Sequence, residues 1–253
     1  MDFTTHWAYH FFNSPDYLAL YQDMTTPWRT GMELDFCEKV LRWRKDHLIL
    51  DAPCGAGRHG WELARRGYTV VGLDFSSYLL TQAQGIREPA DAPPRWVRGL
   101  MQRLPFRDGS FDFVICLFSS FGYGDTEEEN LHIVKEYARV LRPGGKVLID
   151  VMNRHFVLSG LNQVHRSVHG NITVSEYRTL TDNQRRLHNR ITVHFPDGIT
   201  HVYDYRPWMF NGWELSHLVN QANLRVDGLY GNFQAEPYHR KSERAMLVAV
   251  KPA

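Results

Sequence analysis

Short apolar runs alternate with stretches of helical periodicity between residues 48 and 149. Apolar runs predict buried strands at 48–50, 69–73, 111–117 and 147–149, and Trp96-Val97 predicts one more. Helices are predicted at 61–66, at 76–84 and at 131–141, where apolar side chains recur on one face. This alternation predicts a parallel sheet covered by helices on both faces, with ligands bound where the carboxyl ends of the strands meet.

The pattern differs on either side of this segment. Residues 1–45 are rich in aromatic side chains, and Phe36, Val40 and Trp43 have the spacing of one helix face, so we expect an N-terminal helical cap. Residues 160–207 alternate apolar and polar positions around an Asp197-Gly198 turn, which predicts an antiparallel β insert over the active-site edge. Strands near 224–231 and 245–250 then complete an α/β domain made of residues 46–159 and 208–253.

Composition narrows the class of protein without identifying a function. The 253 residues are 43% apolar and 23% charged, and their formal net charge is +1, so no strong field attracts nucleic acid or an anionic membrane. We see no secretory signal and no apolar run long enough to span a bilayer, and the three cysteines are too scattered for a disulfide framework. A cytoplasmic location is expected, and no histidine spacing indicates a metal site.

The strongest chemical signal is the turn that follows the strand at 48–50, with the sequence Asp51-Ala52-Pro53-Cys54-Gly55-Ala56-Gly57-Arg58-His59-Gly60. Gly55 and Gly57 allow the backbone to approach a ligand closely, and the helix start beyond them offers unpaired N–H groups to a carboxylate. Asp51 is an acid where an ammonium group would bind, and Asp74, at the end of the next strand, can accept hydrogen bonds from two ribose hydroxyls.

A second interpretation of this turn is a dinucleotide site. Residues 55–60 also fit the glycine fingerprint of NAD(P)-dependent oxidoreductases, and Asp74 stands where their ribose-binding acid belongs. In that fingerprint the strand runs almost directly into the first glycine, whereas here residues 51–54 intervene. A carboxylate at Asp51 would be unfavourable beside a pyrophosphate but suits an ammonium group, so the oxidoreductase is the less favoured alternative.

These motifs, in this order, resemble those of class I S-adenosylmethionine (SAM)-dependent methyltransferases, especially small-molecule enzymes with an Asp-x-Pro-Cys-Gly-x-Gly-Arg-His first motif. The resemblance covers nearly the whole chain, including residues 71–76, 104–112, 141–145, 230–233 and 242–251. It implies a Rossmann-like, doubly wound, seven-stranded and mostly parallel sheet whose last strand is antiparallel. It also implies SAM as cofactor, S-adenosylhomocysteine (SAH) as product and a small-molecule acceptor whose methylated atom is nitrogen, oxygen or carbon.

The resemblance also implies which residues contact the cofactor. The expected set is Tyr21, Asp51, Ala52, Pro53, Cys54, Gly55, Gly57, Arg58, His59, Asp74, Phe75, Met101 and Leu117. In it, Asp51 and the glycines hold the methionine part, Asp74 holds the ribose, and Tyr21 closes over the methionine carboxylate. One departure concerns the adenine amine, because Leu100 stands where the family often has an acid, so that contact is absent or comes from Gln102 or Arg103.

Methyl transfer requires little from the protein beyond alignment and desolvation of the nucleophile, and it requires a general base only when the acceptor must lose a proton. Segments that leave the fourth and fifth strands, the N-terminal aromatics and the end of the insert are expected to surround the acceptor. The expected contacts are Tyr9, Phe12, Phe118, Ser119, Phe121, Tyr123, Asn153, Arg154, Tyr205 and Trp208, with His155 and Tyr123 as candidate catalytic residues.

Two further alternatives share the same motifs. A nucleic-acid methyltransferase would need a basic face or an added binding domain, which the net charge of +1 does not favour. A non-catalytic module that binds SAM as a sensor would keep the same turn and both acids. The sequence carries no signal for the oligomeric state.

Overall fold

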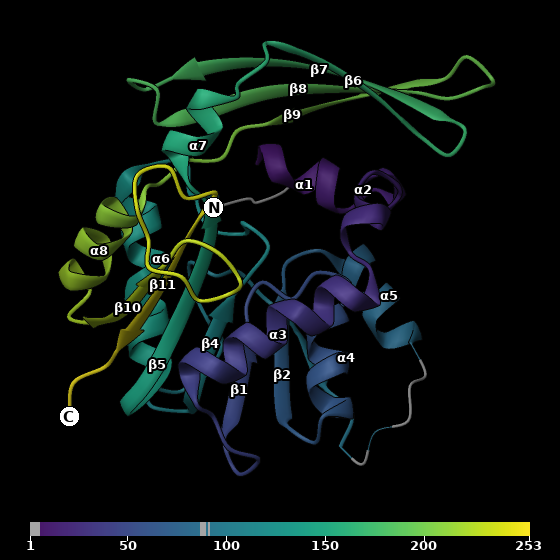
Figure 1. Cartoon of the computed structure of the whole chain (residues 1–253). Helices are drawn as coiled ribbons and strands as arrows, with labels where there is room; N and C mark the ends of the chain where they lie inside the picture. The colour runs from purple at the N-terminus through teal and green to yellow at the C-terminus, as the bar shows by residue number, and fades with distance from the viewer. Residues whose placement is uncertain (1–5, 87–89, 91) are drawn as a thin grey trace.

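The large sheet of the protein has seven strands in the order β10-β11-β5-β4-β1-β2-β3 (Figure 1). A computed structural model describes residues 6–86, 90 and 92–253. The strands are β1 Leu48–Asp51, β2 Thr69–Asp74, β3 Arg95–Arg98, β4 Phe111–Cys116, β5 Leu141–Met152, β10 Arg225–Tyr230 and β11 Arg244–Val250. Strand β11 runs antiparallel to both β5 and β10, while the pairs among β1 to β5 are parallel. The predicted doubly wound sheet with an antiparallel last strand is therefore confirmed.

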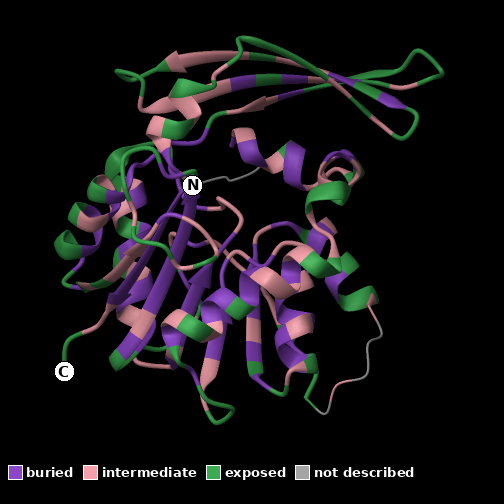
Figure 2. Ribbon diagram, in the orientation of Figure 1, coloured by how far each residue is buried: buried purple, intermediate pink, exposed green. Residues whose placement is uncertain are grey.

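Helices cover both faces of this sheet. They are α1 Trp7–Phe12, α2 Pro15–Tyr21, the 3-10 helix η2 Gln22–Met24, α3 Pro27–Leu41, α4 Arg58–Arg65, α5 Ser77–Gly85, α6 Glu127–Val140, α7 Arg154–Ser159 and α8 Gly212–Gln221. Neighbouring residues of one strand belong to different layers, since Ile49 clusters with Leu63 of α4 and Leu50 clusters with Leu79 of α5. Figure 2 shows that the central strands are buried as this double covering requires.

Two element boundaries differ from the sequence prediction. Helix α3 ends at Leu41, and Arg42 follows in a left-handed conformation with φ 54°, so Trp43 lies beyond the helix although it packs in the same apolar cluster. The sequence predicts a helix to residue 141 and a strand from residue 147, but β5 already begins at Leu141. Its register against β4 shifts between Phe111 and Phe113. Both differences arise at positions where tertiary contacts override local periodicity.

The segment after α7 forms a separate four-stranded antiparallel sheet in the order β6-β7-β8-β9, which we call the insert sheet. Its strands are β6 Val164–His169, β7 Ile172–Thr181, β8 Arg186–His194 and β9 Thr200–Tyr205. The hairpin at Asp197-Gly198 is confirmed, whereas the periodicity did not reveal β6. In Figure 1 this sheet lies across α1 and α2, on the far side of them from the large sheet.

Polar contacts hold the insert sheet on α2. The Tyr203 hydroxyl of β9 donates to Asp16 Oδ2 at 2.6 Å and lies 2.8 Å from Ser14 Oγ, and His201 Nδ1 lies 2.7 Å from Asp16 Oδ2. Helices α1 and α2 are therefore enclosed between the two sheets. In the described part of the chain, no helix has the length and apolar character needed to cross a membrane.

Candidate active site

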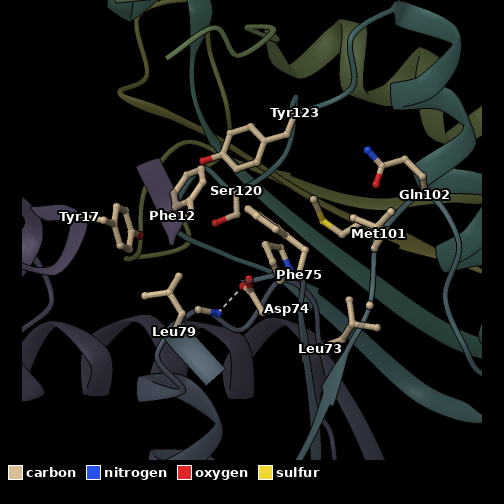
Figure 3. Close-up of a pocket in the computed structure, with 14 residues that line it drawn as sticks. Phe12, Tyr17, Leu73, Asp74, Phe75, Leu79, Met101, Gln102, Ser120 and Tyr123 are labelled. Atoms are coloured by element: carbon tan, nitrogen blue, oxygen red, sulfur yellow. Dashed lines mark hydrogen bonds between the residues drawn. The ribbon is translucent and has the colours of Figure 1, made fainter. Parts of the chain in front are cut away.

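Three adjoining cavities lie where the carboxyl ends of β1, β2 and β4 face α1 and α2. The β2-end cavity, of about 40 Å³, is bordered by Asp74, Phe75 and Met101 and is covered by Phe12 and Tyr123 (Figure 3). The turn cavity, of about 220 Å³, lies over residues 53–56 and also contacts Arg58, His59, Leu117 and Phe118. The aromatic cavity, of about 270 Å³, contains Phe12, Phe118, Ser119, Tyr123 and Tyr205 together with Tyr21. Residues far apart in the sequence thus converge at the predicted edge.

The two glycines of the turn have different structural roles. Gly55 has φ +56° and borders both the β2-end and the turn cavities, with open space where a Cβ would stand. Gly57 lines none of the three cavities, and a Cβ there would lie 2.6 Å from the Trp96 ring and 2.8 Å from Ala83. The small size of Gly57 lets the turn pack on Trp96, while Gly55 leaves the ligand face open, and contact of Gly57 with the cofactor stays a prediction.

Asp51 is a buried carboxyl group with nothing in the described structure to bind. It ends β1 and is fully buried, and both of its carboxyl oxygens lack a hydrogen-bond partner among the described residues. Burial raises the pKa of Asp51 to about 8, with the Arg58 charge opposing the rise and the Asp74 charge adding to it. A buried carboxylate without a partner is strongly unfavourable, so this position is arranged for a cation that is absent from the chain itself.

The neighbours of Asp51 are structural. Ala52 is buried, and its carbonyl accepts a hydrogen bond from the Tyr137 hydroxyl at 2.8 Å. The Cys54 backbone N–H donates to the Leu73 carbonyl at 2.9 Å, and burial raises the pKa of the Cys54 thiol well above its usual range. Cys54 is therefore a thiol that packs in the turn and not a nucleophilic thiolate.

Asp74 occupies the same position on β2 but is already hydrogen-bonded. Its Oδ2 accepts from the Gly55 N–H at 2.8 Å and its Oδ1 accepts from the Ser76 N–H at 2.9 Å. Burial raises the pKa of Asp74 to about 6, against the opposing effect of these backbone donors. The Phe75 backbone N–H also donates to this carboxylate, which has about four lone-pair sites, so Asp74 joins the turn to β2 and still has capacity for a hydroxyl donor in the β2-end cavity.

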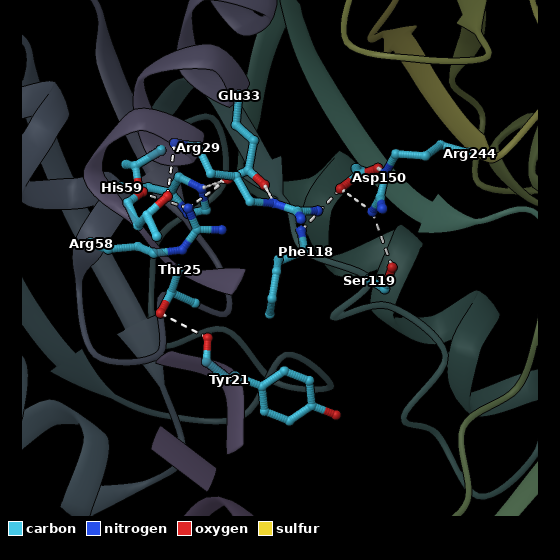
Figure 4. Close-up of polar contacts among 12 residues, drawn as sticks. Tyr21, Thr25, Arg29, Glu33, Arg58, His59, Phe118, Ser119, Asp150 and Arg244 are labelled. Atoms are coloured by element: carbon cyan, nitrogen blue, oxygen red, sulfur yellow. Dashed lines mark hydrogen bonds and ion pairs between the residues drawn. The ribbon is translucent and has the colours of Figure 1, made fainter. Parts of the chain in front are cut away.

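A buried acid that the sequence analysis missed organises the other end of the site. Glu33 of α3 lies 3.0 Å from Arg29 Nε, 2.6 Å from Arg58 Nη1 and 2.8 Å from His59 Nε2 (Figure 4). Burial alone would raise the pKa of Glu33, but the His59 hydrogen bond and the neighbouring charges outweigh it and lower the pKa to about 2. Burial lowers the pKa of His59 to about 4, so this imidazole is neutral. An acid inside an amphipathic helix has no sequence signature, which is why the cluster was not found.

The guanidinium groups of this cluster face the cavities. The Arg29 and Arg58 guanidinium carbons lie 5.5 and 4.9 Å from the centroid of the Phe118 ring, which borders both the turn and the aromatic cavities. Arg58 Nη2 is buried and has no hydrogen-bond partner in the described structure. Two cations share one carboxylate, so one positive charge remains to attract an anionic group in the turn cavity.

The aromatic cavity is walled by tyrosines that stay protonated. The hydroxyls of Tyr123 and Tyr205 lie 3.3 Å apart, and Trp7 contacts both rings edge-on at 5.4 and 5.3 Å. Burial raises the pKa of Tyr123 and of Tyr21 well above the usual range. Figure 4 shows Tyr21 below the Glu33 cluster and, to one side, the buried Arg244, whose guanidinium binds both oxygens of Asp150 at 2.5 and 2.7 Å.

Six of the expected acceptor or catalytic residues line none of the three cavities: Tyr9, Phe121, Asn153, Arg154, His155 and Trp208. The chain turns toward α8 after β5, which carries residues 153–155 away from the cavities. Asn153 caps α7 and donates to the Arg240 and Ser242 carbonyls, Arg154 pairs with Glu214 at 2.6 Å, and the His155 ring lies 6.2 Å from that of Trp213. The expectation that His155 serves as a base at the acceptor is corrected by this placement.

The other misplaced residues have packing roles. The Phe121 ring lies 5.2 Å from the Phe210 ring, and the backbone N–H of Trp208 donates to the Gly122 carbonyl at 2.7 Å. The residues that do line the cavities but were missed include Tyr17, Arg29 and Arg244. Within the described ranges, no group of three or more histidine, cysteine or acidic side chains is arranged to hold a metal ion.

Known proteins match the region that builds these cavities. Residues 49–145 match a family model described as a methyltransferase domain. The cypemycin N-terminal methyltransferase of a Streptomyces species is 28% identical over 223 residues, which cover 84% of this chain and 88% of that protein. The chain spans only 45% of the length of the glycine N-methyltransferase of Rattus norvegicus and 41% of that of the putative methyltransferase YqeM of Bacillus subtilis.

Solved structures of methyltransferases share the fold. The CcbJ methyltransferase from Streptomyces caelestis has a TM-score of 0.77 at 18% identity, covering 88% of this chain and 90% of that one. The SAM-bound amino pentose methyltransferase CalS10 from Micromonospora echinaspora has a TM-score of 0.68 at 21% identity, covering 94% and 97%. Residues 49–145 therefore carry a methyltransferase domain, and the strand order, the turn after β1 and the two strand-end acids resemble those of the class I SAM-dependent methyltransferases, whose fold the solved structures share.

Proposed function

We propose that this methyltransferase binds SAM along the turn and β2-end cavities and methylates the nitrogen of a small-molecule amine in the aromatic cavity. The observation that carries the proposal is Asp51, whose two buried oxygens have no partner in the described structure. An amino acid ammonium group would satisfy both oxygens and remove the penalty of burying the carboxylate alone. A pyrophosphate would increase that penalty.

The charges at the opposite end of the turn cavity support the same ligand. Arg29 and Arg58 share the single carboxylate of Glu33, so the cluster carries an excess positive charge close to Arg58 Nη2. The methionine part of SAM has one ammonium and one carboxylate group. Asp51, buried at the end of β1, is an unpaired acid for the former, and Arg58, which lines the turn cavity, has an unpaired guanidinium nitrogen for the latter, an arrangement complementary in charge.

The nucleoside would then extend toward β2. Asp74 keeps a free acceptor position for a ribose hydroxyl, and Phe75, Met101 and Leu100 border the space for the adenine. Gln102 lines the same cavity and is the available polar partner for the adenine amine. Bound SAM supplies an activated methyl group, and the chain supplies orientation and exclusion of water.

An amine acceptor fits the walls of the aromatic cavity. Aromatic faces attract cationic ammonium groups, and the bound ammonium must lose its proton to solvent before it can react. The resulting neutral amine attacks with its own lone pair, so no protein base is needed in the transition state. The charged side chains among the described lining residues are Arg29, Glu243 and Arg244, and neither arginine can accept a proton. Glycine N-methyltransferase is among the relatives, and the cypemycin enzyme is by name an N-terminal methyltransferase.

Matched acceptors test the proposal. SAH release would be measured with benzylamine, benzyl alcohol and phenol, which share one ring and differ in the nucleophile. We expect turnover with the amine alone, together with calorimetric binding of one SAM per chain. Faster methylation of phenol would contradict the amine assignment, and absence of SAM binding would contradict the whole proposal.

A further inference from the structure

A fourth cavity, of about 330 Å³, lies between α2 and η2 on one side and the insert sheet on the other, and we call it the insert cavity. It shares Tyr21 and Met24 with the aromatic cavity. The insert cavity therefore adjoins the space in which the acceptor would sit, with these two side chains at the boundary. The insert cavity is larger than the aromatic cavity, so the acceptor site has room for far more than a simple amine.

The register of the insert sheet determines what faces this cavity. His165 of β6 pairs with Glu176 of β7, which pairs with Ile191 of β8, which pairs with Tyr203 of β9. Paired residues of adjacent strands share one face of a sheet. At β9 that face is attached to α2 through Tyr203 and Asp16, whereas at β6, β7 and β8 the same face lines the insert cavity.

Glu176 is the fixed polar group of this wall. Its Oε1 accepts from Asn189 Nδ2 at 2.6 Å, its Oε2 is bound by the Arg178 guanidinium, and its side chain is 15% exposed. These bonds, from Asn189 of β8 and Arg178 of β7, hold the carboxylate against the cavity. Tyr21 is close enough for the charges of both Glu176 and Arg178 to affect the pKa of its hydroxyl. The pair is neutral as a whole, so it offers hydrogen bonds without selecting a charged ligand.

The rest of the wall mixes hydrogen-bonding and apolar groups. Ser167 Oγ lies 2.9 Å from His169 Nε2, while His169 Nδ1 is buried and has no partner among the described residues. Leu20, Val174 and Ile191 supply the apolar part. A buried nitrogen without a partner is costly, and it indicates that the cavity receives a polar group.

We infer that the insert cavity is the outer part of the acceptor site and binds a neutral, polyhydroxylated extension of the amine, such as a sugar-like ring or chain. A hydroxyl group both donates and accepts, so neighbouring hydroxyls can donate to Glu176 and accept from Arg178 at once, while the C–H faces contact the apolar side chains. A charged extension would be opposed by one member of the pair. The inference rests on the proposed amine methylation and adds the chemistry of the remainder of the acceptor.

Two amines with the same six-carbon chain test it. 1-Amino-1-deoxysorbitol (glucamine) carries five hydroxyls and hexylamine carries none, and the binding of each to the SAH complex would be measured by calorimetry. In Glu176→Leu we expect the affinity for glucamine to fall at least tenfold and the affinity for hexylamine to change less than twofold. Glu176→Gln keeps the shape of the side chain, removes its charge and should weaken glucamine binding about threefold or more.

Ser175→Leu is the matched control, because Ser175 is the preceding residue of β7 and faces the other side of the insert sheet. It should leave both affinities unchanged. The inference is overturned if glucamine does not bind the SAH complex of the native chain, or if its affinity survives both Glu176 substitutions. It is also overturned if the Glu176 substitutions lower the affinities for the two amines equally. Loss of SAH binding in the native chain would instead contradict the proposed function.

Discussion

The cofactor side and the acceptor side of the site are built in opposite ways. On the cofactor side, the polar groups belong to residues 51–59 and 74–76, two short segments that lie at the ends of adjacent strands of the large sheet. The acceptor side brings Phe12, Tyr21, Phe118 and Tyr205 together from four separate parts of the chain. Charge recognition is thus encoded in short local segments, whereas the shape of the acceptor site depends on how the whole chain folds.

A second contrast lies within the cofactor side. Asp51 and Asp74 end adjacent parallel strands and are both buried, yet the pKa is raised to about 8 for Asp51 and to about 6 for Asp74. Backbone N–H donors from Ser76, Gly55 and Phe75 account for the lower value at Asp74. One acid is left for a ligand, while the other also holds the protein together.

The largest expected effect comes from Asp51→Asn. Removing the carboxylate should weaken SAM binding about a hundredfold, since a charged buried hydrogen bond contributes up to about 3 kcal/mol. The same change should raise the Tm of the unliganded protein. The folded pKa of about 8 exceeds the reference value of 3.8, so the native carboxyl group costs stability progressively as pH rises through that window, and the amide removes this cost.

Asp74→Asn sharpens the comparison as its control. Asp74 holds the Gly55 and Ser76 N–H groups, so this substitution should lower both the SAM affinity and the Tm. Calorimetry and thermal unfolding at pH 8 separate the two cases. If both variants lost Tm equally, Asp51 would not be the uncompensated acid that its surroundings indicate.

The next effect concerns the two glycines of the turn. Gly57→Ala should lower the free energy of unfolding by about 2–4 kcal/mol, because its Cβ would overlap Trp96 and its backbone is left-handed. At Gly55 there is open space for a Cβ, so Gly55→Ala should lose only about 1 kcal/mol of stability, from its positive φ. For each kcal/mol of stability lost, however, Gly55→Ala should weaken SAM binding more than Gly57→Ala does. Urea unfolding and SAM titration measure the two effects, and equal loss of stability in both variants would refute the separate roles.

A smaller and graded effect is expected from pH. Below pH 8 the unliganded Asp51 is mostly protonated, so binding of the SAM ammonium group must release a proton, and affinity should rise up to tenfold per pH unit. Above about pH 8 the amino group of SAM itself loses its proton, and affinity should fall again. Titrations at pH 6 in buffers of different ionisation enthalpy should show release of about one proton. A flat profile, or an unchanged rising limb in Asp51→Asn, would contradict the assignment.

The sequence predicted the cofactor side well because its groups lie at strand ends, where local motifs fix them relative to the sheet. It could not show that Gly57 packs on Trp96, since that contact joins the turn to β3. Glu33 was invisible for a similar reason, because its partners Arg58 and His59 lie on another helix.

On the acceptor side, the sequence predicted which segments reach the ligand edge of the sheet but not the direction in which they leave it. Phe118, Ser119 and residues 153–155 all follow strands at the predicted edge, but only the first two face the aromatic cavity. The direction in which β5 leaves the sheet is set by its contacts with α8 and the C-terminal segment, which periodicity does not contain. Tyr205 reached the cavity only because the insert sheet folds back over α1.

The smallest expected effect comes from Tyr205→Phe in the aromatic wall. It removes one neutral hydrogen bond, from or to the Tyr123 hydroxyl at 3.3 Å, so the free energy of unfolding should fall by about 1 kcal/mol. The affinity for SAM should not change, whereas KM for the amine should rise a few fold because Tyr123 loses the contact that orients its ring. Tyr203→Phe is the matched control: it breaks the contacts with Ser14 and Asp16, outside the aromatic cavity, and should lower the Tm more than Tyr205→Phe does. If Tyr205→Phe weakened SAM binding instead, the two sides of the site would be coupled through the aromatic cover, and the separation drawn between them would fail.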